Sequence, residues 1–129
     1  MQRTFMHAKI HRATVTGSDL GYVGSLTLSP ELLDTAGIGL GELVQVVNIN
    51  NGARFETYTI LGESDAYEVI VNGAAARLVQ AGDKIIIMTY AQLTEEELAG
   101  HESKTVFVDD DNRPVAEAHD RPLAEFLNR

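Results

Sequence analysis

A glycine followed by a serine, Gly24-Ser25, stands between two strand-like runs in the segment GYVGSLTLSP. A residue without a Cβ gives the backbone freedom and leaves its carbonyl open, and the hydroxyl of Ser25 is a nucleophile next to that carbonyl. The pair is therefore suited to an intramolecular acyl shift that breaks the chain. It is equally typical of a turn in which the serine makes a local hydrogen bond. The dipeptide alone does not decide between these two interpretations.

Cationic side chains gather near the N-terminus in the segment KIHRATVT. On a strand with a period of two, Lys9 and His11 share one face, while Ile10 and Arg12 take the other. Lys9 and His11 could therefore converge on one cleft. The alternative is that they are solvated charges of an edge strand.

A second group of polar side chains lies in the segment NNGARFETYTI. Arg54 and Tyr58 are four residues apart and share a strand face, whereas Thr57 points to the opposite side. Arg54 can bind a carboxylate through two parallel hydrogen bonds, and the phenol of Tyr58 can donate a proton beside it. Cross-strand packing is the alternative role for this pair.

The segment VNGAAARL consists mainly of small residues and directly follows a predicted strand. A turn over 72–78 leaves several backbone N–H groups uncrowded, which would suit an anionic oxygen. Tight packing of the turn against the sheet is the alternative. The chain has none of the short motifs of nucleotide-binding loops, zinc proteases or α/β-hydrolases.

Composition narrows the classes of partner. The chain has 129 residues and a formal charge of -9, from 19 acidic side chains against 10 Lys and Arg, which disfavours nucleic acid as a partner. An anionic substrate must therefore be held by a few local cations, because the overall field repels it. The absence of cysteine excludes disulfides and thiolate metal sites. We see no secretory signal and no membrane span, and we expect a soluble cytoplasmic protein of one domain.

Short runs rich in Val, Ile, Thr and Tyr predict a mainly β fold, closed or nearly closed into a barrel. Asn51-Gly52 predicts a type I′ hairpin turn, with φ positive at both residues. The expected strands cover 4–15, 24–29, 43–49, 54–61, 67–71, 84–91 and 104–109.

Three short helices or turns are expected between these strands. Ser29-Pro30 reads as an N-cap and first helical residue, and Gly37 supplies a left-handed end. Thr94 and Glu97 form a capping box, and a further turn covers 74–79. Residues 110–129 are rich in charge and read as an acidic, peripheral tail behind a domain of residues 1–109.

The blocks KIHRATVT, DLGYVGSLT, NNGARFETY, VNGAAARL and AGDKIIIMTY occur in this order. Together they make the chain resemble the aspartate 1-decarboxylases, and the resemblance covers nearly all of residues 1–109. It implies a six-stranded double-psi β-barrel that assembles as a homotetramer, with sites between neighbouring subunits. It also implies a zymogen that cuts itself between Gly24 and Ser25, giving chains of residues 1–24 and 25–129.

In that family the new terminal serine becomes a pyruvoyl group, here at Ser25, and neither a metal nor pyridoxal phosphate is used. The resemblance implies that L-aspartate forms a Schiff base with this carbonyl and leaves as β-alanine and CO₂, for pantothenate and coenzyme A synthesis. The implied catalytic residues are Ser25 and Tyr58, which returns the proton. Lys9 and Arg54 match substrate-binding cations, and Thr57 matches a residue that binds substrate and steadies the oxyanion of self-cleavage.

The remaining site residues also follow from the resemblance. Substrate contacts are implied for Asn72, Gly73, Ala74 and Ala75, and Tyr22 and His11 line the site. Gly21, Val47 and Arg77 depart from residues often found in the family, so cleavage rate and substrate packing could differ.

Two other functions compete with this one. A double-psi barrel can serve as a non-catalytic binding or assembly module, because a fold does not fix a function. A pyruvoyl decarboxylase could also act on a different small amino acid. The joint occurrence of Gly24-Ser25, Lys9, Arg54 and Tyr58 favours a decarboxylase, and two cations favour a dicarboxylic substrate.

Overall fold

The computed structural model describes residues 1–115, and this part of the chain is mainly β. Its strands form one sheet in the order β2-β6-β3-β5-β4-β7-β1-β8. None of the helices in the described part is long and apolar enough to cross a membrane. The elements are β1 (Gln2–Thr14), β2 (Gly17–Asp19), β3 (Ser25–Leu28), α1 (Pro30–Ala36), β4 (Leu43–Asn48), β5 (Arg54–Leu61), β6 (Val69–Asn72), the 3₁₀ helix η1 (Gly73–Leu78), β7 (Lys84–Thr94), α2 (Glu95–Leu98) and β8 (Lys104–Phe107).

The mainly β class is confirmed, and each expected strand has a counterpart at nearly the expected place. The described residues form eight strands in an order whose two ends are not paired, so the six-stranded double-psi barrel stays a prediction. Sequence reasoning missed β2, because its three residues are too short to show alternation. This strand matters for the site, since it pairs in parallel with β6 and the chain continues from it into the Gly24-Ser25 segment.

The hairpin between β4 and β5 forms as expected, but the type I′ turn is wrong. Gly52 has φ 75°, whereas Asn51 has no positive φ. The loop is longer than two residues: the N–H of Gly52 donates to the carbonyl of Asn48, and the N–H of Asn48 donates to the carbonyl of Ala53. A four- or five-residue hairpin loop needs only one left-handed residue, which explains the difference.

The helix ends agree with the sequence signals except at one cap. Pro30 opens α1 and Gly37 ends it at φ 72°, and Thr94 and Glu97 form both bonds of the capping box of α2. Ser29 occupies the N-cap position of α1 without a side-chain capping bond. Its hydroxyl is buried without a partner among the described residues, so the predicted side-chain cap is wrong.

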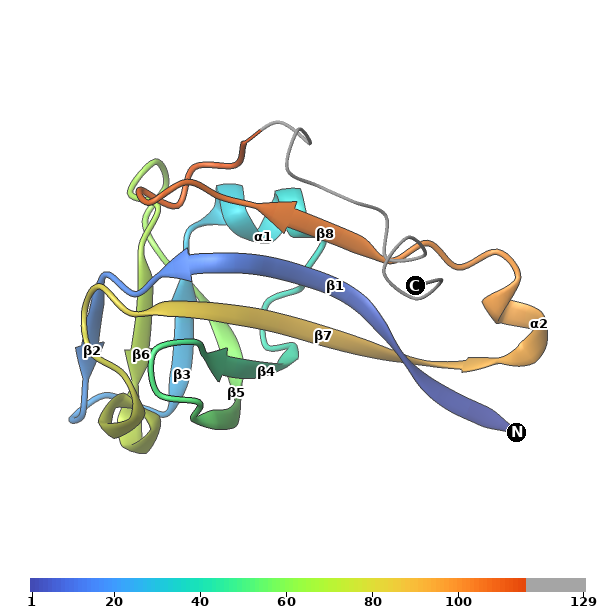
Figure 1. The fold of residues 1–129 in the computed structure, drawn as a ribbon, viewed down its shortest axis with the longest axis horizontal. Coiled ribbons are helices and arrows are strands. Elements are labelled where there is room, and N and C mark those ends of the chain that lie inside the picture. Colours follow the sequence, from blue (N-terminus) through green and yellow to red (C-terminus); the bar gives the residue numbers. More distant parts are fainter. Residues whose placement is uncertain (116–129) are drawn as a thin grey trace.

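The core lies inside the body of the sheet and is covered on one side by α1 (Figure 1). It is almost wholly aliphatic, with fully buried side chains that include Ile10, Leu26, Leu28, Leu32, Val44, Val46, Val69, Val71, Ile85 and Ile87. Figure 1 also shows an arm that projects from the body, formed by the start of β1, the end of β7 and α2. The arm is an antiparallel ladder that runs from the Gln2–Thr94 pair to the Met6–Tyr90 pair.

The first residues after position 109 are tied to the body. Asn112 is fully buried and its amide is bonded to both backbone groups of Thr14 and to the carbonyl of Tyr67. The guanidinium of Arg113 lies 4.5 Å from the ring centre of Tyr67. The proposed domain boundary at residue 109 stays a prediction, and residues 116–129 of the expected tail lie outside the described residues.

Candidate active site

The Gly24-Ser25 linkage lies on a loop that crosses the end of β6. In the sheet, β6 stands between β2 and β3, and Asn72 pairs with Asp19 on one side and with Ser25 on the other. The connection over residues 20–24 must therefore pass over the point where β6 ends. The linkage is thus held at a strand end and is not part of an ordinary hairpin turn.

Hydrogen bonds fix the hydroxyl of Ser25 beside this linkage. Ser25 is buried, and its Oγ donates to the carbonyl of Val23 at 2.7 Å. The side-chain amide of Asn72 donates to Ser25 Oγ at 3.1 Å and to Thr27 Oγ1 at 2.9 Å. Ser25 and Asn72 were both expected in the site, and the structure brings them together.

The backbone of Gly24 packs on the backbone of Gly73. A Cβ added to Gly73 would lie 2.6 Å from Gly24 Cα, whereas a Cβ added to Gly24 would meet nothing within 4 Å. Gly73 has φ 77° and Gly24 has no positive φ. The freedom expected of Gly24 is therefore not used as left-handed backbone here, and the residue that needs to be glycine for steric reasons is Gly73.

Tyr58 lies next to Ser25 in the register of the sheet. Leu26 pairs with Thr59 in the parallel β3–β5 ladder, so Ser25 and Tyr58 are both one residue before this pair. Leu26 and Thr59 face the core, and their preceding residues therefore share the opposite face of the sheet. Thr57 is buried and Tyr58 is 56% exposed, which confirms that these two side chains point to opposite sides.

Lys9 and Arg54 lie on that same outer face but farther away. Lys9 pairs with Met88, Met88 with Gln45, and Gln45 with Glu56, so Lys9 is three strands from β5. At the usual spacing of neighbouring strands this separation is about 14 Å along the sheet. Arg54 is four residues from Tyr58 on β5, or about 13 Å. Within one chain the two cations and the tyrosine share a face without forming one compact pocket.

His11 lies beside Lys9 on β1, at the place where β1 also pairs with β8. Its ring packs edge-on against Phe107 with 5.2 Å between ring centres, and its buried Nδ1 has no partner among the described residues. Burial first, and then the charges of Lys9 and Arg12, lower the pKa of His11 from its ordinary value of 6.5. The neutral imidazole is therefore the favoured form of this side chain.

Arg12 does not follow the expected alternation. It is exposed with φ 64° and lies in an irregularity of the β1–β7 ladder between Ile10 and Ala13, so it does not share the buried face of Ile10. A bulge inserts an extra residue and turns the side chains that follow, which period-two reasoning cannot anticipate.

A cavity of about 400 Å³ opens beside the cleavage loop, and Tyr22, Thr27 and Asn72 line it. Three carboxylates also line it, those of Asp19, Glu63 and Glu68. A dicarboxylic substrate would be repelled from such a wall. Ala74 is exposed and Ala75 packs against the core, and neither lines this cavity.

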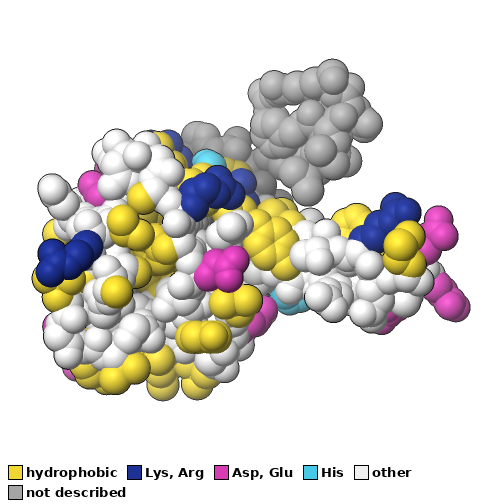
Figure 2. Space-filling model, turned by 90° about the horizontal axis from the view of Figure 1, so that it is seen from below, with side chains coloured by type: hydrophobic (Ala, Val, Ile, Leu, Met, Phe, Trp, Pro, Cys, Tyr) yellow, Lys and Arg dark blue, Asp and Glu magenta, His cyan; other side chains and the backbone are white. Residues whose placement is uncertain are grey.

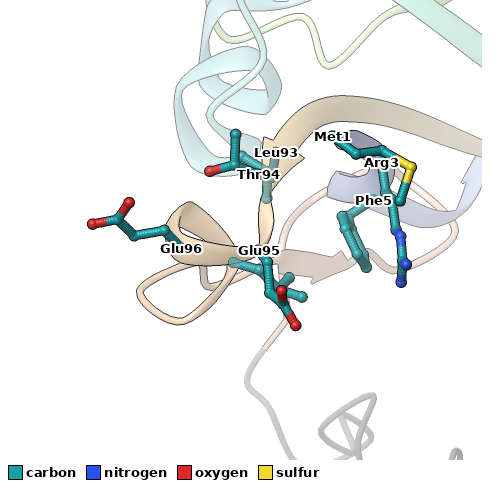
Figure 3. A pocket seen from close by; sticks show the side chains of 8 residues that line it. Met1, Arg3, Phe5, Leu93, Thr94, Glu95 and Glu96 are labelled. Carbon is teal, nitrogen blue, oxygen red and sulfur yellow. The ribbon is translucent and has the colours of Figure 1, made fainter.

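Another cavity, of about 450 Å³, lies on the arm (Figure 3). Side chains from the start of β1, the end of β7 and α2 line it, namely Met1, Arg3, Phe5, Leu93, Thr94, Glu95, Glu96 and Leu98. It contains none of the residues expected in the site.

The body also carries apolar side chains on its surface. Figure 2 shows one face on which apolar side chains lie exposed and the Lys and Arg side chains are few and separated. Leu43, Tyr58 and Tyr90 are each at least 43% exposed, and Leu43 pairs with Tyr58 across the β4–β5 ladder. Exposed large apolar side chains near polar ones are typical of surfaces that contact another protein.

Sequence reasoning missed two hydrogen-bond partners at the linkage, one of Ser25 and one of Asn72. The carbonyl of Val23 accepts the hydrogen bond of the Ser25 hydroxyl, and Thr27 Oγ1 accepts the second hydrogen bond of the Asn72 amide. The first is a backbone group and carries no signal in the sequence. The second could have been found from alternation, since Thr27 lies two residues after Ser25 and shares its strand face.

Comparison with known proteins agrees with these features. A family model described as aspartate decarboxylase matches residues 1–115. Proteins named aspartate 1-decarboxylase from Neisseria meningitidis and Caldicellulosiruptor saccharolyticus are 59% and 56% identical, covering 88% and 95% of this chain and 89% and 95% of their own. The one from Staphylococcus aureus strain JH9 is 51% identical over 94% of this chain and 95% of its own.

These matches make the chain an enzyme of the carboxy-lyase class. It belongs to the aspartate decarboxylase family.

Proposed function

We propose that this protein decarboxylates L-aspartate to β-alanine and CO₂ in the cytoplasm, as a step of pantothenate and coenzyme A synthesis. The carbonyl that the reaction needs comes from Ser25 after self-cleavage of the Gly24-Ser25 bond. One observation carries the proposal: the hydroxyl of Ser25 is buried and bonded to Val23 and Asn72 beside this bond, with Tyr58 adjacent in the sheet.

Self-cleavage uses groups of the chain itself. Ser25 Oγ attacks the carbonyl carbon of Gly24, the C–N bond breaks, and an ester replaces the amide while the freed nitrogen takes the hydroxyl proton. Loss of the Cα proton of Ser25 then breaks the ester bond and releases Gly24 as a carboxylate. The dehydroalanine that is left takes up water and loses ammonia, which converts the former serine to a pyruvoyl group.

The surroundings of Ser25 suit this conversion. Its hydroxyl already donates a hydrogen bond to the carbonyl of Val23. The lone pairs of the hydroxyl oxygen can therefore turn toward the preceding peptide. Thr57 is buried on the opposite face of β5 from Tyr58, so a twist of the strand or a site shared between subunits must bring its hydroxyl, the proposed donor, to the oxyanion of the attack. Once formed, the pyruvoyl group supplies an electron sink for the bond to the departing CO₂.

The other residues bind substrate and move one proton. We assign Arg54 to a bidentate bond with one carboxylate of L-aspartate and Lys9 to the second carboxylate. Tyr58 donates the proton that replaces CO₂. Asn72 and the backbone at Gly73, Ala74 and Ala75 orient the substrate, and Tyr22 and His11 line the site.

A second copy of the chain is needed to make this site compact. Lys9 and Tyr58 lie three strand spacings apart, with β7 and β4 between their strands, and this distance is longer than aspartate can span. Contact of two such faces would bring cations of one copy to the Ser25 of another and would cover Leu43 and Tyr90. We therefore propose a homotetramer of double-psi barrels with sites between subunits.

Activity on L-aspartate tests the proposal. Purified protein should release β-alanine, and Ser25→Ala should abolish the release because no carbonyl can form. Ser18→Ala, at an exposed serine of β2, is the matched control and should keep full activity. Release of β-alanine by Ser25→Ala would refute the mechanism.

A further inference from the structure

The end of β6 meets the cleavage loop at one glycine. The loop over residues 20–24 leaves β2 beside Asn72 and enters β3 beside Asn72, so it spans two strand spacings, about 10 Å, across the end of β6. The residue that follows Asn72 is Gly73, which is buried and lies directly against this loop. The topology therefore puts Gly73 under the Gly24-Ser25 linkage.

We propose that Gly73 is a positioning residue for self-cleavage, on which the backbone of Gly24 rests at a distance that only glycine permits. This inference rests on the proposed function and adds to it, because it assigns Gly73 a role before any substrate is present. Asn72 holds the serine side of the linkage and Gly73 supports the glycine side. Two consecutive residues thus fix both halves of the bond that breaks.

The contact leaves no room for a methyl group. A Cβ at Gly73 would lie 2.6 Å from Gly24 Cα, 2.9 Å from Gly24 N and 3.3 Å from the carbonyl oxygen of Tyr22. All three are backbone atoms, which cannot turn aside as the end of a side chain can. Gly24 would have to move by about 0.8 Å to reach the 3.4 Å at which ordinary contact begins.

A displacement of this size acts on the geometry of the attack. Ser25 stays bonded to Asn72 through β3 and its side chain, whereas the carbonyl of Gly24 moves with the loop. A misplacement of about 1 Å between reacting groups can slow a reaction roughly 100-fold. We therefore expect Gly73→Ala to slow self-cleavage by about two orders of magnitude.

The left-handed conformation of Gly73 must be separated from the contact. Gly52 has φ 75°, close to the 77° of Gly73, but a Cβ at Gly52 would meet nothing within 4 Å. Gly52→Ala therefore carries the same backbone strain without a clash and is the matched control. It should cleave at the rate of the wild type, followed by gel electrophoresis and intact mass over time.

The outcomes separate the two proposals. An uncleaved wild-type chain overturns the proposed function itself. A wild type that cleaves, with Gly73→Ala cleaving at the same rate, overturns only this inference. Equal slowing of Gly73→Ala and Gly52→Ala also overturns it, because strain and not contact would then be the cause.

A second measurement covers the case in which Gly73→Ala does not fold. The uncleaved Ser25→Ala chain, labelled with ¹³C at glycine, should give a close-range NMR correlation between the α positions of Gly24 and Gly73. The correlation supports the contact, and its absence in the folded chain overturns the inference.

Discussion

Asn112→Ala offers a test of how the chain beyond residue 109 is attached to the body. The amide of Asn112 accepts from Thr14 N at 2.7 Å, donates to the Thr14 carbonyl at 2.8 Å and donates to the Tyr67 carbonyl at 3.1 Å. Asn112 also has φ 63°, a left-handed conformation that asparagine tolerates better than alanine. The substitution removes all three bonds and keeps the strained backbone.

The expected loss of stability follows from these contacts. Each hydrogen bond contributes about 1 kcal/mol, and the left-handed alanine costs about 1 kcal/mol more, so the free energy of unfolding should fall by about 4 kcal/mol. This is a large part of the roughly 5–15 kcal/mol that stabilises a typical domain. A domain of this size would lose roughly 15 °C in Tm.

Thermal and denaturant unfolding of the Ser25→Ala chain would measure this, because that background should stay a single polypeptide. Asn112→Gly should recover about 1 kcal/mol by relieving the backbone. Asp111→Ala, at the exposed neighbouring position, should change stability by less than about 0.5 kcal/mol. A loss below about 1 kcal/mol in Asn112→Ala would refute the assignment of Asn112 as an anchor.

Three further predictions concern the site. Tyr58→Phe should leave self-cleavage intact and lower kcat by about 10²-fold or more at little changed KM, and unchanged kcat would remove Tyr58 as the proton donor. Arg54→Ala should raise KM for L-aspartate, with Arg54→Lys restoring little because a point charge cannot replace the bidentate contact; full recovery by lysine would contradict this. The lowered pKa of His11 means that its contribution to stability is present above pH 6.5 and is lost as pH falls toward the folded-state pKa. His11→Gln should therefore lose less stability than the parent chain between pH 7 and 5, and parallel pH profiles would show that His11 does not titrate in this way.

Local signals predicted most of the strands and helix ends. The run over 54–61 coincides with β5, and Pro30, Gly37 and the Thr94–Glu97 box set helix ends as expected. The failures are places where long-range contacts decide the outcome. The three-residue β2 exists because β6 offers it a partner, and Ser29 is buried at a cap position where its hydroxyl finds no bond.

The geometry of the candidate site was only partly predictable from the sequence. Alternation correctly placed Thr57 and Tyr58 on opposite faces, and the bulge at Arg12 broke the same rule on β1. No local pattern reveals that β2 and β3 flank β6, so the close approach of Gly24 and Gly73 could not be foreseen. The contact between these two glycines follows from the order of the strands in the sheet, which local sequence patterns do not determine.

Intact mass spectrometry of the purified, untagged protein is the most direct test of the central claim. We predict two chains that divide between Gly24 and Ser25, with the longer one lighter by one ammonia than a chain that begins with serine. A single uncut polypeptide after prolonged incubation, or a longer chain that begins with an unmodified Ser25, would contradict the account.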